Sequence, residues 1–170
     1  VGSVEYQYPN HLFQAGYFLD KKYYDENTID FKHLLLSEKN QSLLKDIQNS
    51  NSVGVHIRRG DYMTKQNLVI FGNICTQKYY HDAIRIITEK VNDAVFYVFS
   101  DDISWVQTHL DIPNAVYVNW NTGESSIYDM YLMSSCKYNI IANSTFSYWA
   151  ARLNLSLIHI SEPTRPEPIS

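Results

Sequence analysis

The chain has 170 residues, of which 45% are hydrophobic and 19% charged, and its formal net charge is −4. This length and composition fit one globular domain with a substantial core, while the negative charge and the lack of a basic stripe argue against general nucleic-acid binding. Cys75 and Cys136 form no CxxC motif, so both are expected to be reduced structural thiols. No apolar run has the pattern of a signal peptide or a membrane span, so neither segment is expected in this chain.

The first part of the chain shows little periodicity and then a helical pattern. Residues 1–30 are rich in Tyr and Asn and are expected to form a lead-in segment, not a domain. From residue 31 to about 48, apolar positions recur at helical spacing, which predicts one amphipathic helix or a broken pair. The apolar positions of this pattern are Leu34, Leu35, Leu43, Leu44 and Ile47.

Residues 53–58 predict a strand that ends in charged side chains. Apolar residues occupy every second position, and the pattern then breaks where a turn is expected. Ligands of open α/β sheets bind beyond the carboxyl ends of strands, and two adjacent guanidinium groups suit a diphosphate. An Arg-Asp surface ion pair beside a turn is the alternative. The side chains at this strand end are His56, Arg58, Arg59 and Asp61.

Strands and helices then alternate along the chain. Thr76 is predicted to cap a helix that runs to about residue 90, and the apolar run at 95–99 predicts a buried parallel strand. This alternation predicts an α/β fold, a Rossmann-like parallel sheet with helices on both faces. The further predicted elements are a short helix at 104–110, a strand at 115–118, a helix at 125–136 with Ile127, Met130, Tyr131 and Met133 inward, a strand at 138–142 and a helix ending near residue 153.

Polar residues follow two more of the predicted strands. Asp101 and Asp102 come directly after the second strand, and the hydroxyl-rich segment 143–147 follows the fourth, at the start of a helix where phosphate oxygens bind well. Helix capping is the simpler interpretation of Asp101-Asp102 and of Ser144 and Thr145. Three such strand ends together favour one nucleoside diphosphate. Guanine is the expected base because it presents two adjacent donors to one carboxylate.

These segments together resemble the α-1,2-fucosyltransferases of glycosyltransferase family 11. The resemblance rests on Val-Gly-Val-His-Ile-Arg-Arg-Gly-Asp-Tyr at 53–62, Phe-Tyr-Val-Phe-Ser-Asp-Asp at 96–102, and the segment 129–154. The first contains the His-x-Arg-Arg-x-Asp motif of the wider fucosyltransferase group. All three stand in the family's order and spacing, and the resemblance covers residues 12–154.

The resemblance implies inverting transfer of fucose from GDP-fucose to the 2-hydroxyl of a terminal galactose on an oligosaccharide or glycolipid, without a metal or other cofactor. By matching positions, Arg58 would bind the β-phosphate and stabilise the leaving group, and His56 and Asp102 would contact the guanosine. Asp61 would orient the arginines, the favoured role, or act as general base. The implied catalytic residues are Arg58 and Asp61, and the implied donor-site residues are His56, Arg58, Arg59, Asp101, Asp102, Asn143, Ser144, Thr145 and Phe146.

The resemblance also predicts how the chain is organised. Family members are expected to have a GT-B fold, of which this chain would hold the donor-binding half. Residues 1–48 would be the end of the N-terminal acceptor region and the crossover, and residues 49–154 the GDP-fucose-binding domain. Residues 155–170 look like read-through of a cloning or sequencing adapter and are expected to be a non-native tail. Such a truncated chain would bind donor without the complete cleft that transfer requires.

The sequence leaves two other functions open. A non-catalytic GDP or nucleotide-sugar-binding module would bind GDP without turnover. An unrelated phosphate-handling α/β enzyme would need a nucleophile or metal cluster, which the sequence does not display. The expected location is the bacterial cytoplasm or the inner-membrane surface, with a Golgi membrane as the alternative for a eukaryotic source; the oligomeric state is left open.

Overall fold

The computed structural model describes residues 4–8, 11–15, 31–60, 74–154 and 158–160, with side chains described for 31–60 and 74–154. The chain forms two compact units, residues 1–33 and 34–170. In the first unit, β1 (Val4–Tyr8) and β2 (His11–Ala15) pair as an antiparallel hairpin. The sequence did not predict this hairpin because the periodicity of the segment is weak.

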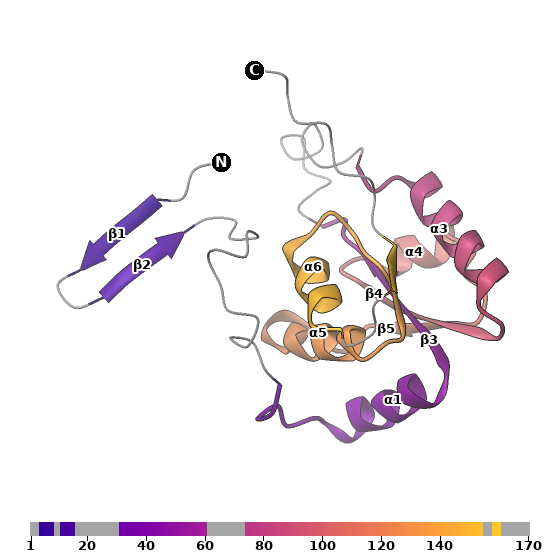
Figure 1. Ribbon diagram of the computed structural model, residues 1–170, viewed down its shortest axis with the longest axis horizontal. Coiled ribbons are helices and arrows are strands. Elements are labelled where there is room, and N and C mark those ends of the chain that lie inside the picture. The colour runs from indigo at the N-terminus through magenta and orange to yellow at the C-terminus, as the bar shows by residue number, and fades with distance from the viewer. Residues whose placement is uncertain (1–3, 9–10, 16–30, 61–73, 155–157, 161–170) are drawn as a thin grey trace, which may run out of the picture. The chain divides into compact units, whose positions relative to one another are not determined.

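A parallel sheet forms the centre of the second unit (Figure 1). Among the described residues, five strands lie in the order β5-β4-β3-β6-β7, and each neighbouring pair is parallel. The predicted α/β fold with a parallel sheet is therefore confirmed. The strands are β3 (Asn51–Ile57), β4 (Ala94–Ser100), β5 (Ala115–Val118), β6 (Tyr138–Ile140) and β7 (Ile158–Ile160).

Strand β7 lies inside the segment 155–170, which was left out of the predicted fold. It pairs with β6 in register from Tyr138 opposite Ile158 to Ile140 opposite Ile160. The non-native origin of this segment stays a prediction, as do the domain limits at 48/49 and 154/155.

Helices cover both faces of the sheet, as the alternation of elements predicted. Because successive strand residues point to opposite faces, β4 contributes to two cores. Phe96 and Val98 pack with residues of α3 and α4, whereas Tyr97 and Phe99 pack with residues of α1, α5 and α6. The helices are α1 (Glu38–Asn49), α3 (Gln77–Lys90), α4 (Ile103–His109), α5 (Ser126–Ser134) and α6 (Thr145–Arg152), with the 3-10 turn η3 (Gly123–Ser125) before α5.

The predicted cap and inner face of α3 are confirmed. Thr76 Oγ1 accepts a hydrogen bond from the Tyr79 backbone N–H at 3.2 Å, which satisfies one of the N–H groups at the start of the helix. The buried residues of this helix are Tyr80, Ala83, Ile84 and Ile87.

The predicted helix at 31–48 starts later than expected. Ser37 caps α1 by accepting from the Asn40 N–H at 3.3 Å, so the helix begins at Glu38. Leu35 lies before this cap and is 86% exposed. Leu43 and Ile47 are buried against the sheet, so this segment contributes to the core of the second unit.

The predicted inner face of α5 is right in part. Met133 is buried and Met130 packs against the core, as predicted, whereas Ile127 is 37% exposed and the inner face also includes Asp129 and Leu132. The buried positions 129, 132 and 133 keep helical spacing, but one of them is a carboxylate. An apolar pattern alone therefore could not locate the face.

Candidate functional site

Three chemically distinct segments meet at one edge of the sheet. The basic segment follows β3, the acidic segment follows β4, and the hydroxyl-rich segment follows β6. Since β4 and β6 are the two parallel neighbours of β3, their carboxyl ends lie on either side of the basic segment. The sequence predicted each strand end, and the strand order makes the three segments neighbours.

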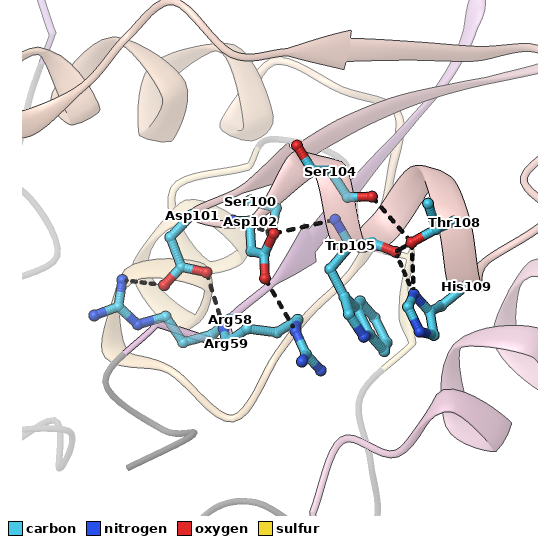
Figure 2. A network of polar contacts seen from close by, with 9 residues as sticks. All are labelled: Arg58, Arg59, Ser100, Asp101, Asp102, Ser104, Trp105, Thr108 and His109. Carbon is cyan, nitrogen blue, oxygen red and sulfur yellow. Dashed lines mark hydrogen bonds and ion pairs between the residues drawn. The ribbon is translucent and has the colours of Figure 1, made fainter.

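Asp101 holds both arginines through one carboxylate (Figure 2). Its Oδ2 lies 2.9 Å from Arg58 Nη1, and its Oδ1 accepts from the Arg59 backbone N–H at 2.9 Å. Gly60 makes this approach possible, since a Cβ there would lie 2.6 Å from Asp101 Oδ2. An ion pair of the kind considered from the sequence thus exists, with a partner from the neighbouring strand. Asp61 lies outside the described residues.

Asp102 and Trp105 contact the side chain of Arg59 from the start of α4 (Figure 2). Asp102 Oδ1 caps the helix by accepting from the Trp105 N–H at 3.1 Å, and its Oδ2 lies 3.5 Å from Arg59 Nε. The Arg59 guanidinium carbon lies 3.6 Å from the centroid of the Trp105 ring. The capping interpretation of Asp102 is confirmed, and Trp105 is a neighbour of the site that the sequence analysis missed.

His56 links the basic segment to the hydroxyl-rich one. Its ring centroid lies 4.8 Å from that of Phe146, and its backbone carbonyl accepts from the Tyr80 hydroxyl at 3.2 Å. Burial, and then the charge of Arg58, lower the pKa of His56 from 6.5 to about 3, so its imidazole is neutral at ordinary pH.

The ring atom Nδ1 of His56 is buried and has no hydrogen-bond partner within the part of the chain that the structure describes. A buried polar atom in this situation is costly unless something else satisfies it. Its position at the strand edge is therefore consistent with a ligand contact.

The segment 143–147 is held by hydrogen bonds at the start of α6. Ser144 Oγ accepts from the Phe146 N–H at 3.2 Å, which confirms the capping interpretation. The backbone N–H of Asn143 donates to Cys75 Sγ at 3.1 Å, and the buried Ser147 hydroxyl donates to the Ala142 carbonyl at 2.9 Å. Thr145 is exposed in the first turn. Hydroxyls and N–H groups of this kind can bind an anion.

A second polar cluster lies between α1, the segment after β5, and α5. The Asn121 amide donates to Asp129 Oδ1 at 2.7 Å, and Asn121 and Asn40 exchange hydrogen bonds of 3.0 and 3.1 Å. The Trp120 ring N–H donates to Asn40 Oδ1 at 2.7 Å. Burial raises the pKa of Asp129 to about 7, against the opposing effect of the Asn121 hydrogen bond. The only signal of this cluster in the sequence is one carboxylate within an apolar helix.

In the part of the chain that the structure describes, no group of three or more His, Cys, Asp or Glu side chains lies close enough together to hold a metal ion. None of the helices in that part of the chain is long and apolar enough to cross a membrane.

The fold and this edge define a parallel α/β protein with paired arginines, a buried neutral histidine and a hydroxyl-rich helix start around one strand end. The sequence model of the family described as Glycosyl transferase family 11 matches residues 5–167. The chain belongs to glycosyltransferase family 11, the α-1,2-fucosyltransferase family.

Similar proteins occur in bacteria and mammals. An alpha-1,2-colitosyltransferase of Escherichia coli is 36% identical over 89% of this chain and 52% of its own length. The O-antigen biosynthesis glycosyltransferase WbnK of Escherichia coli is 46% identical over 63% of this chain and 36% of its own. The galactoside alpha-(1,2)-fucosyltransferase 2 of Pongo pygmaeus is 28% identical over 79% of this chain and 42% of its own length. The chain thus spans about half or less of these curated relatives.

Proposed function

We propose that this chain is the donor-binding part of an inverting α-1,2-fucosyltransferase that transfers fucose from GDP-fucose to the 2-hydroxyl of a terminal galactose. Family membership supports the reaction class. The observation that carries the donor site is the meeting of Arg58, Arg59 and the segment 143–147 at adjacent strand ends, beside the buried Nδ1 of His56, which has no hydrogen-bond partner among the described residues.

Different residues of the site bind different parts of GDP-fucose. Arg58 binds the β-phosphate, and Arg59 with the segment 143–146 binds the remaining phosphate oxygens and lines the fucose. His56 contacts the guanosine as a neutral imidazole, which a pKa of about 3 ensures. Asp102, whose side chain is 42% exposed, is proposed to contact the guanosine as well as Arg59 and the start of α4. Asp101 positions the two arginines, because one of its oxygens contacts the Arg58 guanidinium and the other contacts the Arg59 backbone N–H.

The proposed reaction depends on stabilising the negative charge of the leaving group more than on covalent catalysis. As the bond from fucose C1 to the β-phosphate oxygen breaks, negative charge accumulates on GDP, and a fixed guanidinium stabilises it without reorganising. The galactose oxygen forms the new bond on the opposite face of C1 and loses its proton to a base. Asp61 is the candidate for that base or for a second group that orients the arginines.

The acceptor is a galactose-ended oligosaccharide or glycolipid, and its site lies largely in a preceding domain of a GT-B protein. Residues 1–48 are the end of that region and the crossover, residues 49–154 are the donor domain, and residues 155–170 are a non-native tail. Because one relative is named for colitose, GDP-colitose is the alternative donor to be compared with GDP-fucose. A bacterial cytoplasmic location, at or near the inner membrane, fits the two Escherichia coli relatives.

Calorimetric titration of the full 170-residue chain tests the donor site. GDP, GDP-fucose and GDP-colitose are compared in buffer with EDTA, because donor binding is proposed to need no metal. Arg58→Ala is expected to weaken GDP binding about tenfold to a hundredfold, the loss of a charge-assisted hydrogen bond of about 1.5–3 kcal/mol.

Arg85→Ala is the matched control for the charge that Arg58→Ala removes. Arg85 is 62% exposed on α3 and pairs with Glu89, so its loss changes the net charge equally without touching the sheet edge. Equal weakening by both variants, or no GDP binding by folded chain, would refute the donor site. GDP binding without fucose transfer in an assembled full-length protein would favour the non-catalytic binding module.

A further inference from the structure

Arg59 is held differently from its neighbour Arg58. Nη1 of the Arg58 guanidinium forms an ion pair with Asp101 Oδ2 at 2.9 Å. The Arg59 guanidinium instead lies flat against an aromatic ring, with its central carbon 3.6 Å from the centroid of Trp105. Its ion pair with Asp102 is longer, at 3.5 Å, and Arg59 Nε makes no hydrogen bond within the described residues.

Trp105 is itself fixed from several sides. It packs against the core formed by β3, β4 and α3, and its ring stacks on that of His109, with centroids 4.5 Å apart and planes at 12°. His109 Nδ1 in turn lies 2.7 Å from the Thr108 hydroxyl and 2.9 Å from the Trp105 carbonyl. Figure 2 shows Arg59 and His109 on opposite sides of the Trp105 ring. The ring is therefore a rigid support.

A stacked ring holds a guanidinium through its face and takes none of its N–H groups. Those groups lie in the plane of the guanidinium and point outward, where they can donate to an anion. Asp102 restricts the same side chain at Nε while also capping the helix that carries Trp105. Stacking therefore orients Arg59 without consuming the donors that a phosphate would need.

We infer that Trp105 is a positioning residue for the donor site, acting through Arg59. This inference rests on the proposed function. Trp105 lowers the cost of ordering Arg59 when the diphosphate binds, because the side chain is already confined.

GDP titrations of the full chain test the inference through a double-mutant cycle. Trp105→Leu is expected to weaken GDP binding about threefold to thirtyfold, and Trp105→Phe less, because Phe keeps an aromatic face. In the Arg59→Ala background, Trp105→Leu is expected to add less than about a twofold loss, since the residue it positions is gone. An equal loss in both backgrounds would show a structural role and overturn the inference.

A second measurement needs no ligand. The Arg59 Nε–Hε signal in a ¹H–¹⁵N spectrum should carry a ring-current shift in the wild type, keep part of it in Trp105→Phe, and lose it in Trp105→Leu. An unshifted wild-type signal would overturn the contact. If folded wild type fails to bind GDP, the proposed function falls and the donor role of Trp105 with it. If Arg59→Ala weakens GDP binding and Trp105→Leu does not, this inference alone fails.

Discussion

Gly60→Ala should damage the site while sparing the fold. The new Cβ would lie 2.6 Å from Asp101 Oδ2 and 3.3 Å from its Cγ, whereas ordinary contacts begin near 3.4 Å. The obstructing atom is the end of a flexible side chain, so it can move aside by about 0.8 Å at little cost in packing. That movement, however, acts on the same oxygen that pairs with Arg58 at 2.9 Å.

The expected magnitudes follow from the exposure of the pair. The Arg58 side chain is 36% exposed and that of Asp101 is 25% exposed, so the ion pair contributes about 1 kcal/mol or less to folding. The free energy of unfolding in urea should therefore fall by no more than about 1 kcal/mol. GDP binding should weaken about threefold to tenfold, because Arg58 and the Arg59 backbone lose a shared anchor.

Calorimetry tests whether Gly60→Ala weakens GDP binding by displacing Asp101. The four proteins compared are wild type, Gly60→Ala, Asp101→Ala and the double variant. If the reasoning holds, Gly60→Ala adds little to the loss already caused by Asp101→Ala. Unchanged GDP affinity in Gly60→Ala, or additive losses in the double variant, would refute it.

Two predictions concern stability. Gly54→Ala should lower the free energy of unfolding in urea by about 1–3 kcal/mol, since its Cβ would lie 2.4 Å from Asn139 Oδ1 and 3.0 Å from Met133 Cγ in the core; an unchanged midpoint would contradict this packing. Asp129 has a pKa raised to about 7, so the free energy of unfolding should fall as pH rises from about 4 to about 7, by at most about 4 kcal/mol. His56 acts in the opposite direction over this range, so the difference between wild type and Asp129→Asn isolates the effect; a pH-independent difference would contradict it.

Local patterns in the sequence predicted the strands and the chemistry of their ends. The apolar runs of β3 and β4 are buried as expected, and the charged and hydroxyl residues follow where those patterns stop. Because parallel strands present their carboxyl ends at one edge, the topology could be expected to gather these residues. Thr76, Asp102 and Ser144 cap helices because their side chains reach nearby N–H groups, a local property that sequence reveals.

Contacts between elements could not be read in the same way. The pairing of Asp101 with Arg58 depends on β4 lying beside β3, and the stacking of Trp105 on Arg59 depends on where α4 packs. Part of the inner face of α5 was missed because it includes the carboxylate of Asp129, which accepts a hydrogen bond from Asn121, eight residues earlier. In each case a distant or polar partner decides the geometry, and periodicity carries no information about it.

Mapping GDP on the chain by ¹H–¹⁵N spectroscopy tests the central claim most directly. The account predicts that GDP shifts the backbone amide signals of residues 56–60 and 143–147 together, and that Arg58→Ala removes both sets of shifts at the same GDP concentration. Shifts confined to a different part of the sheet, or shifts at 143–147 that persist in Arg58→Ala at wild-type affinity, would contradict a diphosphate site at this strand edge.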